Sequence, residues 1–223
     1  MSTLLGMFAK YWQPGQVKTR LARTVGFEKA ALIHQAFVET LLARFDSMAD
    51  SRIVLFAPPT AQPHFREMVS RPWRLAPQTA GDLGCRMRNF FEGALTEFDR
   101  IVLIGSDSPD LPVEFVADAL EALRTFDVAL GPTTDGGYYL VGAARRVPPI
   151  FEGLDWSTPA VWSQTTGHLQ AAQIAWHELP GWYDVDDEVG LRAVLANVNM
   201  EGFIDPHLRI LEGRLLDLVG GRK

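Results

Sequence analysis

The sequence predicts an α/β protein in which helices connect the strands of a largely parallel sheet. Short apolar runs alternate along the chain with longer segments of helical periodicity, which is typical of strands joined by crossover helices. No internal repeat or low-complexity segment interrupts this alternation. The 223 residues, 47% of them hydrophobic, suffice to bury one sizeable core, so we expect a single main domain.

The predicted strands are short apolar runs bounded by turn residues. The run "RIVLIG" is the clearest buried strand, and Pro58 and Pro59 end the run "RIVLFAPP". We predict strands at residues 3–9, 52–59, 73–78, 100–105, 127–132, 138–143 and 174–179.

The predicted helices fill the longer segments, where apolar side chains recur at helical spacing. One of these helices is expected to bury Leu83 and Met87, and Pro112 suits the first turn of the next because its missing N–H costs nothing there. We predict helices at residues 27–48, 65–69, 82–98, 112–123, 159–172 and 187–199.

Composition excludes several classes of partner. The net charge of −6 argues against nucleic acid, because binding to a phosphate backbone depends on clustered Lys and Arg. No stretch approaches the length of a membrane span, and the apolar start of the chain is too short for a secretory leader. The single Cys85 cannot form an intramolecular disulfide. We therefore expect a cytoplasmic protein with no membrane span and no nucleic-acid partner.

Ligands of open α/β sheets collect beyond the carboxyl ends of the strands. In "FAKYWQPGQVKTRLA", Gly15 permits a turn after the first strand, and Lys18 and Arg20 would direct donors at an anion such as a phosphate. The segment lacks the second glycine of a Walker A loop. The alternative is a pair of surface cations that precede a helix.

A carboxylate follows the clearest buried strand. In "IGSDSPDLP", Asp107 is held at the strand end, which suits a magnesium ion that takes one or two carboxylates plus phosphate oxygens. Asp110 lies just before the proline that begins a helix, so turn formation or charge compensation at the helix terminus explains it better than metal binding.

Two further segments carry acids near strand ends. In "TTDGGYYLVG", Asp135 would be an acceptor or a base, although Asp-Gly-Gly is also ordinary hairpin chemistry. In "WYDVDDEVGL", the extended backbone puts Asp184 and Asp186 on one side, and Asp187 suits a helix N-cap. Acids brought together would repel each other unless a cation lies between them. The isolated His34 is expected in the core or at the surface.

These segments also carry a resemblance. The ordered set "FAKYWQPGQVKTRLA", "QTAGDLGCRM", "IGSDSPDLP", "LGPTTDGGYYLVG", "LDWSTPAVW" and "WYDVDDEVGL" resembles a bacterial family of GT-A-superfamily transferases of largely unassigned activity. This family was formerly a domain of unknown function and is often named as glycosyltransferases. It is related to the nucleotide-diphosphate-sugar transferases and to the phospholactate guanylyltransferases. The resemblance covers most of residues 3–195.

The resemblance implies a nucleotide-diphosphate-sugar-transferase fold, Rossmann-like, with a mixed, mostly parallel sheet between helices. It makes residues 1–200 one GT-A-like domain and leaves 201–223 as a helical tail. One expectation is that this tail forms the contacts of a homodimer. The implied nucleotide-binding residues are Phe8, Ala9, Lys10, Gly15, Lys18, Arg20, Gln78, Asp82, Arg86, Ser106 and Asp107. The implied acceptor-side residues are Asp135, Gly136, Gly137, Tyr138, Trp156 and Ser157.

For the metal, the resemblance implies Asp107 together with Asp186 or Asp184 as ligands of Mg²⁺ or Mn²⁺. The last motif departs from the family pattern, with Asp187 and Glu188 where Thr-Pro is usual, which leaves the choice between the two acids open.

Three functions remain open after this step. The first is a metal-dependent glycosyltransferase that uses a nucleotide-diphosphate-sugar donor and a small-molecule acceptor, with Lys18, Arg20, Asp107 and Asp135 as catalytic residues. The second is a nucleotidyltransferase that transfers NMP from an NTP to a phosphorylated small molecule and releases pyrophosphate. The third is a nucleotide-binding protein without catalysis.

Overall fold

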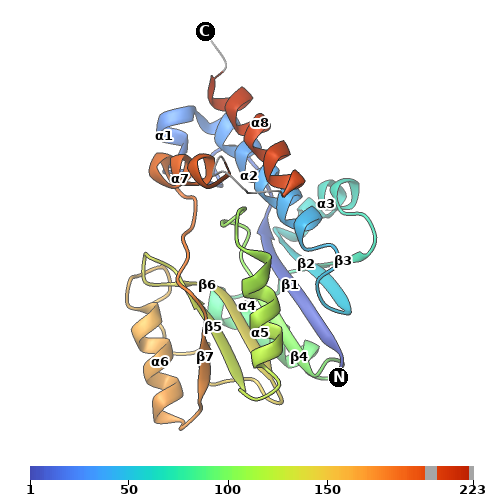
Figure 1. Cartoon of the computed structure of the whole chain (residues 1–223), viewed down its shortest axis with the longest axis vertical. Helices are drawn as coiled ribbons and strands as arrows, with labels where there is room; N and C mark the ends of the chain where they lie inside the picture. The colour runs from blue at the N-terminus through green and yellow to red at the C-terminus, as the bar shows by residue number, and fades with distance from the viewer. Residues whose placement is uncertain (199–204, 221–223) are drawn as a thin grey trace.

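All seven predicted strands are present in the computed structural model, which describes residues 1–198 and 205–220. They form one sheet in the order β3-β2-β1-β4-β6-β5-β7 (Figure 1). The strands are β1 (Thr3–Lys10), β2 (Ser51–Ala57), β3 (Trp73–Pro77), β4 (Arg100–Ile104), β5 (Val128–Pro132), β6 (Tyr138–Ala144) and β7 (Trp176–Glu178).

The sheet is mixed and mostly parallel, as expected. β1 runs parallel to β2 and β4, β2 runs parallel to β3, and β5 runs parallel to β7. Only β6 runs against its neighbours β4 and β5, because a tight turn closed by a hydrogen bond from the Thr133 amide to the Gly137 carbonyl (3.0 Å) reverses the chain. The carboxyl ends of β1 and β4 therefore lie at the same edge as the start of β6.

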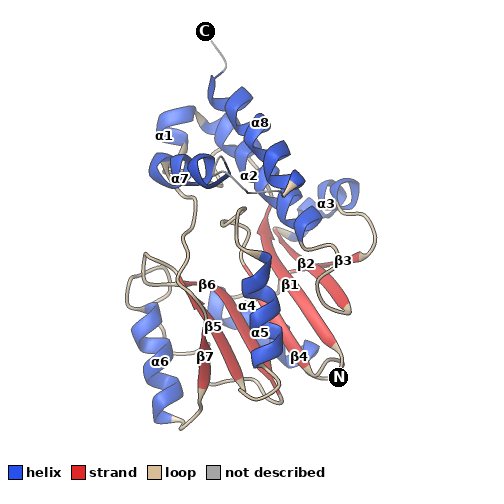
Figure 2. Ribbon diagram, in the orientation of Figure 1, coloured by secondary structure: helices blue, strands red, loops and turns tan. Residues whose placement is uncertain are grey.

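Helices cover both faces of the sheet (Figure 2). The predicted helices are all present in the described residues, with ends shifted by at most four positions, and residue 199 of the last one lies outside them. The short α1 was not predicted. The helices are α1 (Ala22–Val25), α2 (Phe27–Arg44), α3 (Gln62–Met68), α4 (Leu83–Ala94), α5 (Val113–Ala122), α6 (Val161–Ala171), α7 (Glu188–Val198) and α8 (Pro206–Gly220), with a 3₁₀ turn at Pro59–Ala61.

Three apolar clusters hold these layers together. On one face α2, α3 and α5 bury side chains such as Phe45 and Phe65 against the sheet, and on the other face α4 buries Phe91. The third cluster joins the outer side of α2 to α7 and α8, through Phe37 among others. Each fully buried aliphatic or aromatic side chain contributes about 1.5–3 kcal/mol, so packing on both sides fixes α2 firmly.

Leu83 departs from its prediction, because its side chain is 43% exposed and lies on the surface of a cleft. The helical spacing that predicted its burial continues back from Met87 and Phe90, which are buried. Leu83 is the first residue of α4, at the end of the helix that borders the cleft. Its exposure leaves an apolar side chain available there.

Arg44 at the end of α2 ties α8 to the rest of the fold. Its Nε donates to Asp205 Oδ2 (2.6 Å), and its Nη1 donates to the carbonyls of Pro109 (2.9 Å) and Leu111 (2.8 Å). Burial alone would raise the pKa of Asp205, but the bond with Arg44 outweighs it and lowers that pKa. α8, which lies in the predicted helical tail, is thus attached to α2 by an ion pair and by apolar packing.

Candidate active site

A cleft of about 970 Å³ opens at the sheet edge where β1, β4 and β6 meet. Its walls come from the loop after β1, the start of α4, the loop after β4, the β5–β6 turn and two later loops. Most residues predicted for the site line it, namely Phe8, Ala9, Lys10, Lys18, Arg20, Gln78, Arg86, Ser106, Asp107, Asp135, Gly137, Tyr138, Trp156, Ser157, Asp184 and Asp186.

Three predicted site residues do not line the cleft. Gly15 supplies a turn at φ +80°, and Asp82 caps α4 by accepting from the Cys85 amide (2.8 Å). Gly136 packs so tightly that a Cβ there would lie 2.4 Å from the Pro159 carbonyl oxygen. All three have local backbone roles that their motifs could not distinguish from ligand contacts.

Lys18 lies at the centre of the charged part of this cleft. Its ammonium pairs with Asp107 and with Asp186 Oδ1 (3.1 Å). Its side chain is only 2% exposed and its Nζ is 5.7 Å from the centre of the Phe37 ring, whereas the two aspartates are 43% and 45% exposed. The pairing joins the loop after β1 to the loops that follow β4 and precede α7.

The pKa shifts agree with this pairing. Burial alone would lower the pKa of Lys18, but Asp107 and Asp186 outweigh it and raise that pKa. Burial would likewise raise the pKa of Asp107, but the Lys18 ammonium outweighs it and lowers that pKa. Both partners therefore remain charged near neutral pH. The buried ammonium of Lys18 balances the negative charge of the more exposed carboxylates.

Main-chain bonds hold the acidic segment in register with the strand end. The Val185 amide donates to the Asp107 carbonyl (2.8 Å), and the Leu21 amide donates to the Asp186 carbonyl (3.0 Å). Between them, Asp184 Oδ1 accepts from Ser108 Oγ (2.7 Å). Burial, with repulsion from Asp107, raises the pKa of Asp184 to about 6. The burial of Asp184 and its repulsion from Asp107 both favour the protonated carboxyl.

His34 was not expected in the site, yet it lies beside Asp107. Its Nε2 is 3.1 Å from the Lys10 carbonyl, which can only accept, so Nε2 carries the proton. Its Nδ1 is buried without a hydrogen bond, 3.8 Å from Asp107 Oδ1. Burial lowers the pKa of His34 to about 4, so the ring is neutral at pH 7. The only signal in the sequence was a polar residue within the buried stripe of α2.

Two predicted nucleotide-side residues are fixed on the opposite wall. Gln78 donates from Nε2 to the Leu55 carbonyl (2.9 Å), and Arg86 donates from Nε to the Gly81 carbonyl (2.8 Å). Arg86 Nη1 also donates to Gln78 Oε1 (3.3 Å). Arg20, in contrast, is exposed at the mouth of the cleft.

The β5–β6 turn places Asp135 at the cleft. Its Oδ1 accepts from Thr133 Oγ1 (2.5 Å) and from the Gly137 amide (3.2 Å), so the turn fixes the carboxylate. Next to it, Tyr138 meets Trp156 edge to face, with ring centres 6.3 Å apart. Thr133, which anchors this turn, was not singled out from the sequence.

Other acids of these motifs have structural roles. Asp187 caps α7 as expected, since its Oδ1 accepts from the Gly190 amide (3.0 Å). Asp110 lies in a turn, as expected, but the turn is buried: Asp110 is 3% exposed and accepts from Tyr183 and from Asn197 Nδ2 (3.0 Å). That buried network links the loop after β4 to α7.

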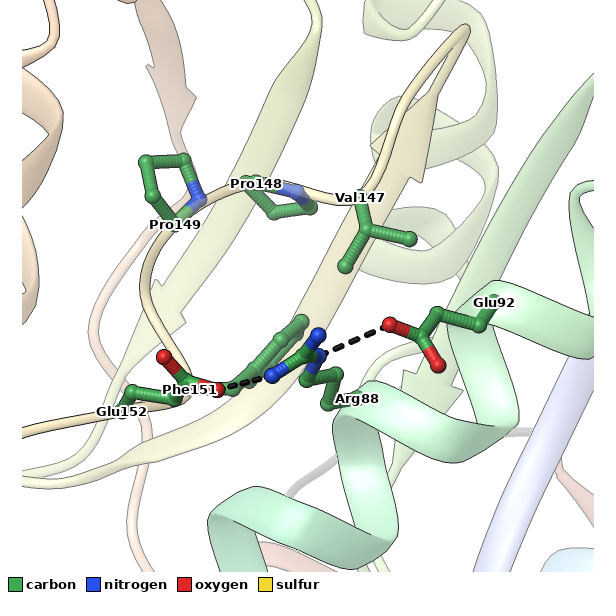
Figure 3. A pocket seen from close by; sticks show the side chains of 7 residues that line it. All are labelled: Arg88, Glu92, Val147, Pro148, Pro149, Phe151 and Glu152. Atoms are coloured by element: carbon green, nitrogen blue, oxygen red, sulfur yellow. Dashed lines mark hydrogen bonds and ion pairs between the residues drawn. The ribbon is translucent and has the colours of Figure 1, made fainter.

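A second, smaller pocket of about 370 Å³ lies elsewhere, against the outer side of α4 (Figure 3). Arg88 is its cation, and it is paired with Glu92 (2.7 Å) and Glu152. The rest of its lining is Val147, Pro148, Pro149 and Phe151. Because its charges compensate one another, the large cleft is the better candidate site.

Residues 41–158 match the family model described as "Uncharacterized protein conserved in bacteria (DUF2064)". The chain belongs to this family. The protein in a crystal structure of a "putative nucleotide-diphospho-sugar transferase" from Desulfovibrio desulfuricans G20 is 32% identical in sequence to this chain. The match has a TM-score of 0.90 and covers 99% of this chain and 98% of the other. The fold is that of the nucleotide-diphosphate-sugar transferases.

More distant structures share the fold alone. One is the 4-diphosphocytidyl-2C-methyl-D-erythritol synthase from Anaerococcus prevotii DSM 20548, with 7% identity, a TM-score of 0.57 and coverage of 89% of this chain and 99% of that one. Another is Rv0371c from Mycobacterium tuberculosis H37Rv in complex with manganese, with 16% identity, a TM-score of 0.51 and coverage of 86% and 97%. A search of curated proteins gives no match.

The described residues, 1–198 and 205–220, contain no membrane-spanning helix and no preformed metal site. None of their helices has both the length and the apolar character that a membrane span requires. No three of their His, Cys, Asp or Glu side chains converge into a ready metal cage. Cations in nucleotide sites commonly take only one or two carboxylates from the protein, with phosphate oxygens completing the set.

Proposed function

We propose that this family member is a metal-dependent glycosyltransferase that uses a nucleotide-diphosphate-sugar donor. The observation that carries the proposal is the buried Lys18 ammonium between Asp107 and Asp186 at the carboxyl ends of β1 and β4. A diphosphate with its cation needs this combination of a fixed positive charge and nearby carboxylates. The fold, shared with nucleotide-diphosphate-sugar transferases, supports the same assignment.

The carboxylates fit a divalent cation. Asp107 and Asp184 supply hard oxygen ligands. The pKa of Asp184 is raised to about 6 by burial and, to a smaller extent, by repulsion from Asp107, and a cation would relieve that repulsion. Asp107 and Asp186 are both paired with Lys18, whereas Asp184 forms no ion pair with any described residue. We therefore assign Asp184 as the second metal ligand beside Asp107, at the strand end, and Asp186 as a further partner of Lys18. When bound, Mg²⁺ or Mn²⁺ would neutralise the charge of the diphosphate as a Lewis acid.

The remaining residues would bind and orient the diphosphate and accept a proton from the acceptor. Lys18 keeps a fixed positive charge beneath the diphosphate, and the exposed Arg20 can close over it with a planar fork of donors. Both would stabilise the negative charge that develops on the leaving nucleoside diphosphate. Asp135, held by Thr133 and the Gly137 amide, would accept the proton of the attacking acceptor hydroxyl.

Product identity tests the proposal. Purified protein is incubated with nucleotide sugars or nucleoside triphosphates, Mn²⁺ and a mixture of small hydroxylated acceptors, and the released nucleotide or pyrophosphate is measured. We expect nucleoside diphosphate from one nucleotide sugar. Pyrophosphate release from a triphosphate would instead establish nucleotidyl transfer, and binding without turnover would indicate a nucleotide-binding protein.

Two variants test whether turnover depends on the charged site. Asp107→Ala removes a metal ligand and the partner of Lys18, so turnover should fall at least about 100-fold while the far-UV circular dichroism spectrum stays unchanged. Asp118→Asn is the matched control, because Asp118 pairs with His177 (3.0 Å) away from the cleft. Near-normal turnover in a folded Asp107→Ala protein would refute the metal assignment.

A further inference from the structure

The cleft is uneven in charge. Its cationic side chains, Lys10, Lys18, Arg20 and Arg86, come from the segments around β1 and the start of α4. The lining residues from 133 to 161, all within the described part of the chain, include no Lys, Arg or His. These residues form what we call the β6 wall, since they surround the start of β6. A phosphorylated ligand would find no cation on the β6 wall.

The β6 wall has a rigid aromatic platform. The indole of Trp156 packs against the first turn of α4, where a Cβ on Gly84 would lie 2.6 Å from Trp156 Nε1 and 2.1 Å from the Phe151 carbonyl oxygen. On its other side Trp156 meets the ring of Tyr138 edge to face. The glycine thus lets the indole fit between α4 and β6. The half-exposed Leu83 borders the same part of the cleft.

Polar groups surround this platform. The Tyr138 hydroxyl is buried and forms no hydrogen bond with any described residue, although other atoms of Tyr138 line the cleft. Asp135 provides a carboxylate, and Ser157, at φ +65°, holds a strained backbone conformation beside Trp156. A buried hydroxyl without a partner costs free energy, and a small shift of the ring toward the cleft would let a ligand hydroxyl recover that cost. Strained residues of this kind cluster at ligand sites.

We propose that the β6 wall binds the acceptor, and that the acceptor is an uncharged sugar ring. A sugar offers an apolar face of C–H groups to the Trp156 ring and hydroxyls to Tyr138 and Asp135, which matches an aromatic platform rimmed by polar groups without cations. This inference rests on the proposed glycosyl transfer, in which a sugar hydroxyl is the nucleophile.

Glycosyl transfer to this acceptor would form one bond and break another. The acceptor hydroxyl oxygen forms a bond to the anomeric carbon of the donor, and its proton passes to Asp135. The bond between that carbon and the diphosphate oxygen breaks, and the nucleoside diphosphate leaves with the electron pair near Lys18. An aromatic wall without cations favours this chemistry over transfer to a phosphorylated acceptor.

The test is saturation-transfer-difference NMR on the intact protein, with Mn²⁺ replaced by diamagnetic Mg²⁺ and a saturating nucleoside diphosphate present. The probes are neutral methyl glycosides of common hexoses and N-acetylhexosamines, each compared with the corresponding sugar 6-phosphate. We expect ring-proton signals from at least one neutral glycoside, and no tighter binding of its 6-phosphate. Tighter binding of the phosphate, or no signal from any glycoside, would overturn the inference.

Variants locate the contact. Trp156→Leu should weaken the glycoside about tenfold, and Trp156→Phe should restore most of that loss. Trp176→Leu, which changes another partly buried tryptophan outside the cleft, should leave the affinity unchanged. Unchanged affinity in Trp156→Leu would contradict the assignment, and so would displacement of the glycoside by the complete nucleotide sugar at equal nucleotide occupancy.

The same samples separate this inference from the proposed function. Nucleotide binding is measured on wild type and on Trp156→Leu by calorimetry. Normal nucleotide binding without any glycoside contact would refute the acceptor assignment alone. Glycoside binding that depends on Trp156, in a protein that binds no nucleotide, would refute the proposed function and leave a sugar site.

Discussion

The two halves of the cleft are built in different ways. The half at β1 and β4 is charged, and it is held by ion pairs that join segments far apart in the sequence, Lys18 with Asp107 and Asp186. The half at β6 is aromatic and has no cation in its lining, and it is held by the close approach of Trp156 to Gly84. One half is organised by charge and the other by shape.

This difference indicates how each half responds to its surroundings. Ion pairs depend on pH and on bound cations, so the charged half should change with metal and proton concentration. Apolar and aromatic packing has little such dependence, so the β6 wall should stay the same under those conditions. Variants in the two halves can therefore be separated by the variable to which each responds.

The largest effect should come from Lys18. Lys18→Met leaves the Asp107 and Asp186 carboxylates without their cation, so we expect a loss of about 1–3 kcal/mol in the free energy of unfolding and at least about a 100-fold loss of turnover. Urea denaturation and product release measure these two quantities. An unchanged unfolding midpoint in Lys18→Met would show that the ion pairs do not hold the charged half.

Arg20→Met is the matched control for Lys18. Its side chain is exposed, and no ion pair in the described residues includes it. The free energy of unfolding should stay within about 0.5 kcal/mol of wild type. Weaker nucleotide binding at unchanged stability would assign Arg20 to the ligand alone.

The β6 wall should respond to a single methyl group. Gly84→Ala places a Cβ against Trp156 and the Phe151 carbonyl, so we expect a loss of about 1–3 kcal/mol and a change in tryptophan fluorescence. Gly93→Ala in the same helix meets no atom within 4 Å and should stabilise the protein by up to about 1 kcal/mol. Equal effects of the two changes on stability would show that the glycine contact does not hold the indole.

The smallest effect is a pH dependence of the charged half. The folded-state pKa of Asp184, about 6, lies above the ordinary 3.8, so the folded state binds more protons between these values and wild type loses stability as the pH rises through them. Asp184→Asn lacks this loss. In the presence of a chelator, its free energy of unfolding relative to wild type should increase by about 1–2 kcal/mol between about pH 4 and pH 7.

Asp205→Asn should behave in the opposite way. Its folded-state pKa is lowered by Arg44, against the effect of burial, so its contribution is present above the unfolded-state pKa and is lost as the pH falls through the folded-state value. The variant should be less stable than wild type at neutral pH and equal to it in strong acid. Parallel pH profiles of Asp184→Asn and Asp205→Asn would contradict at least one of the two assignments.

Much of the fold could be predicted because its signals are local. Strands such as Arg100–Ile104 are short apolar runs between turns, and helices such as Phe27–Arg44 show helical periodicity. The reversed direction of β6 follows from a two-glycine turn that suggested a hairpin without fixing its place in the sheet. Leu83 was misplaced because periodicity does not show that the first residue of a helix borders an open cleft.

Without the family resemblance, the site could be predicted only where polar residues follow strands. Lys18, Asp107 and Asp184 do so, and the topology brings them to one edge. The resemblance additionally pointed to Arg86 and Trp156, which also line the cleft. His34 lies in the middle of a helix, and only the packing of α2 beside β1 takes it to Asp107. Asp82 and Gly136 lie inside convincing motifs but serve the backbone, because caps and turns use the same residue types as ligand sites.

The most direct test of the charged half is a thermal-shift panel of nucleoside diphosphates, triphosphates and nucleotide sugars, each with and without Mg²⁺ or Mn²⁺. A ligand at 100 times its dissociation constant adds about 2.7 kcal/mol, which for a chain of this size raises the melting temperature by several degrees. We predict a metal-dependent shift by one nucleotide sugar that Asp107→Ala abolishes. A shift that needs no metal and persists in Asp107→Ala, or no shift with any nucleotide, would contradict the account.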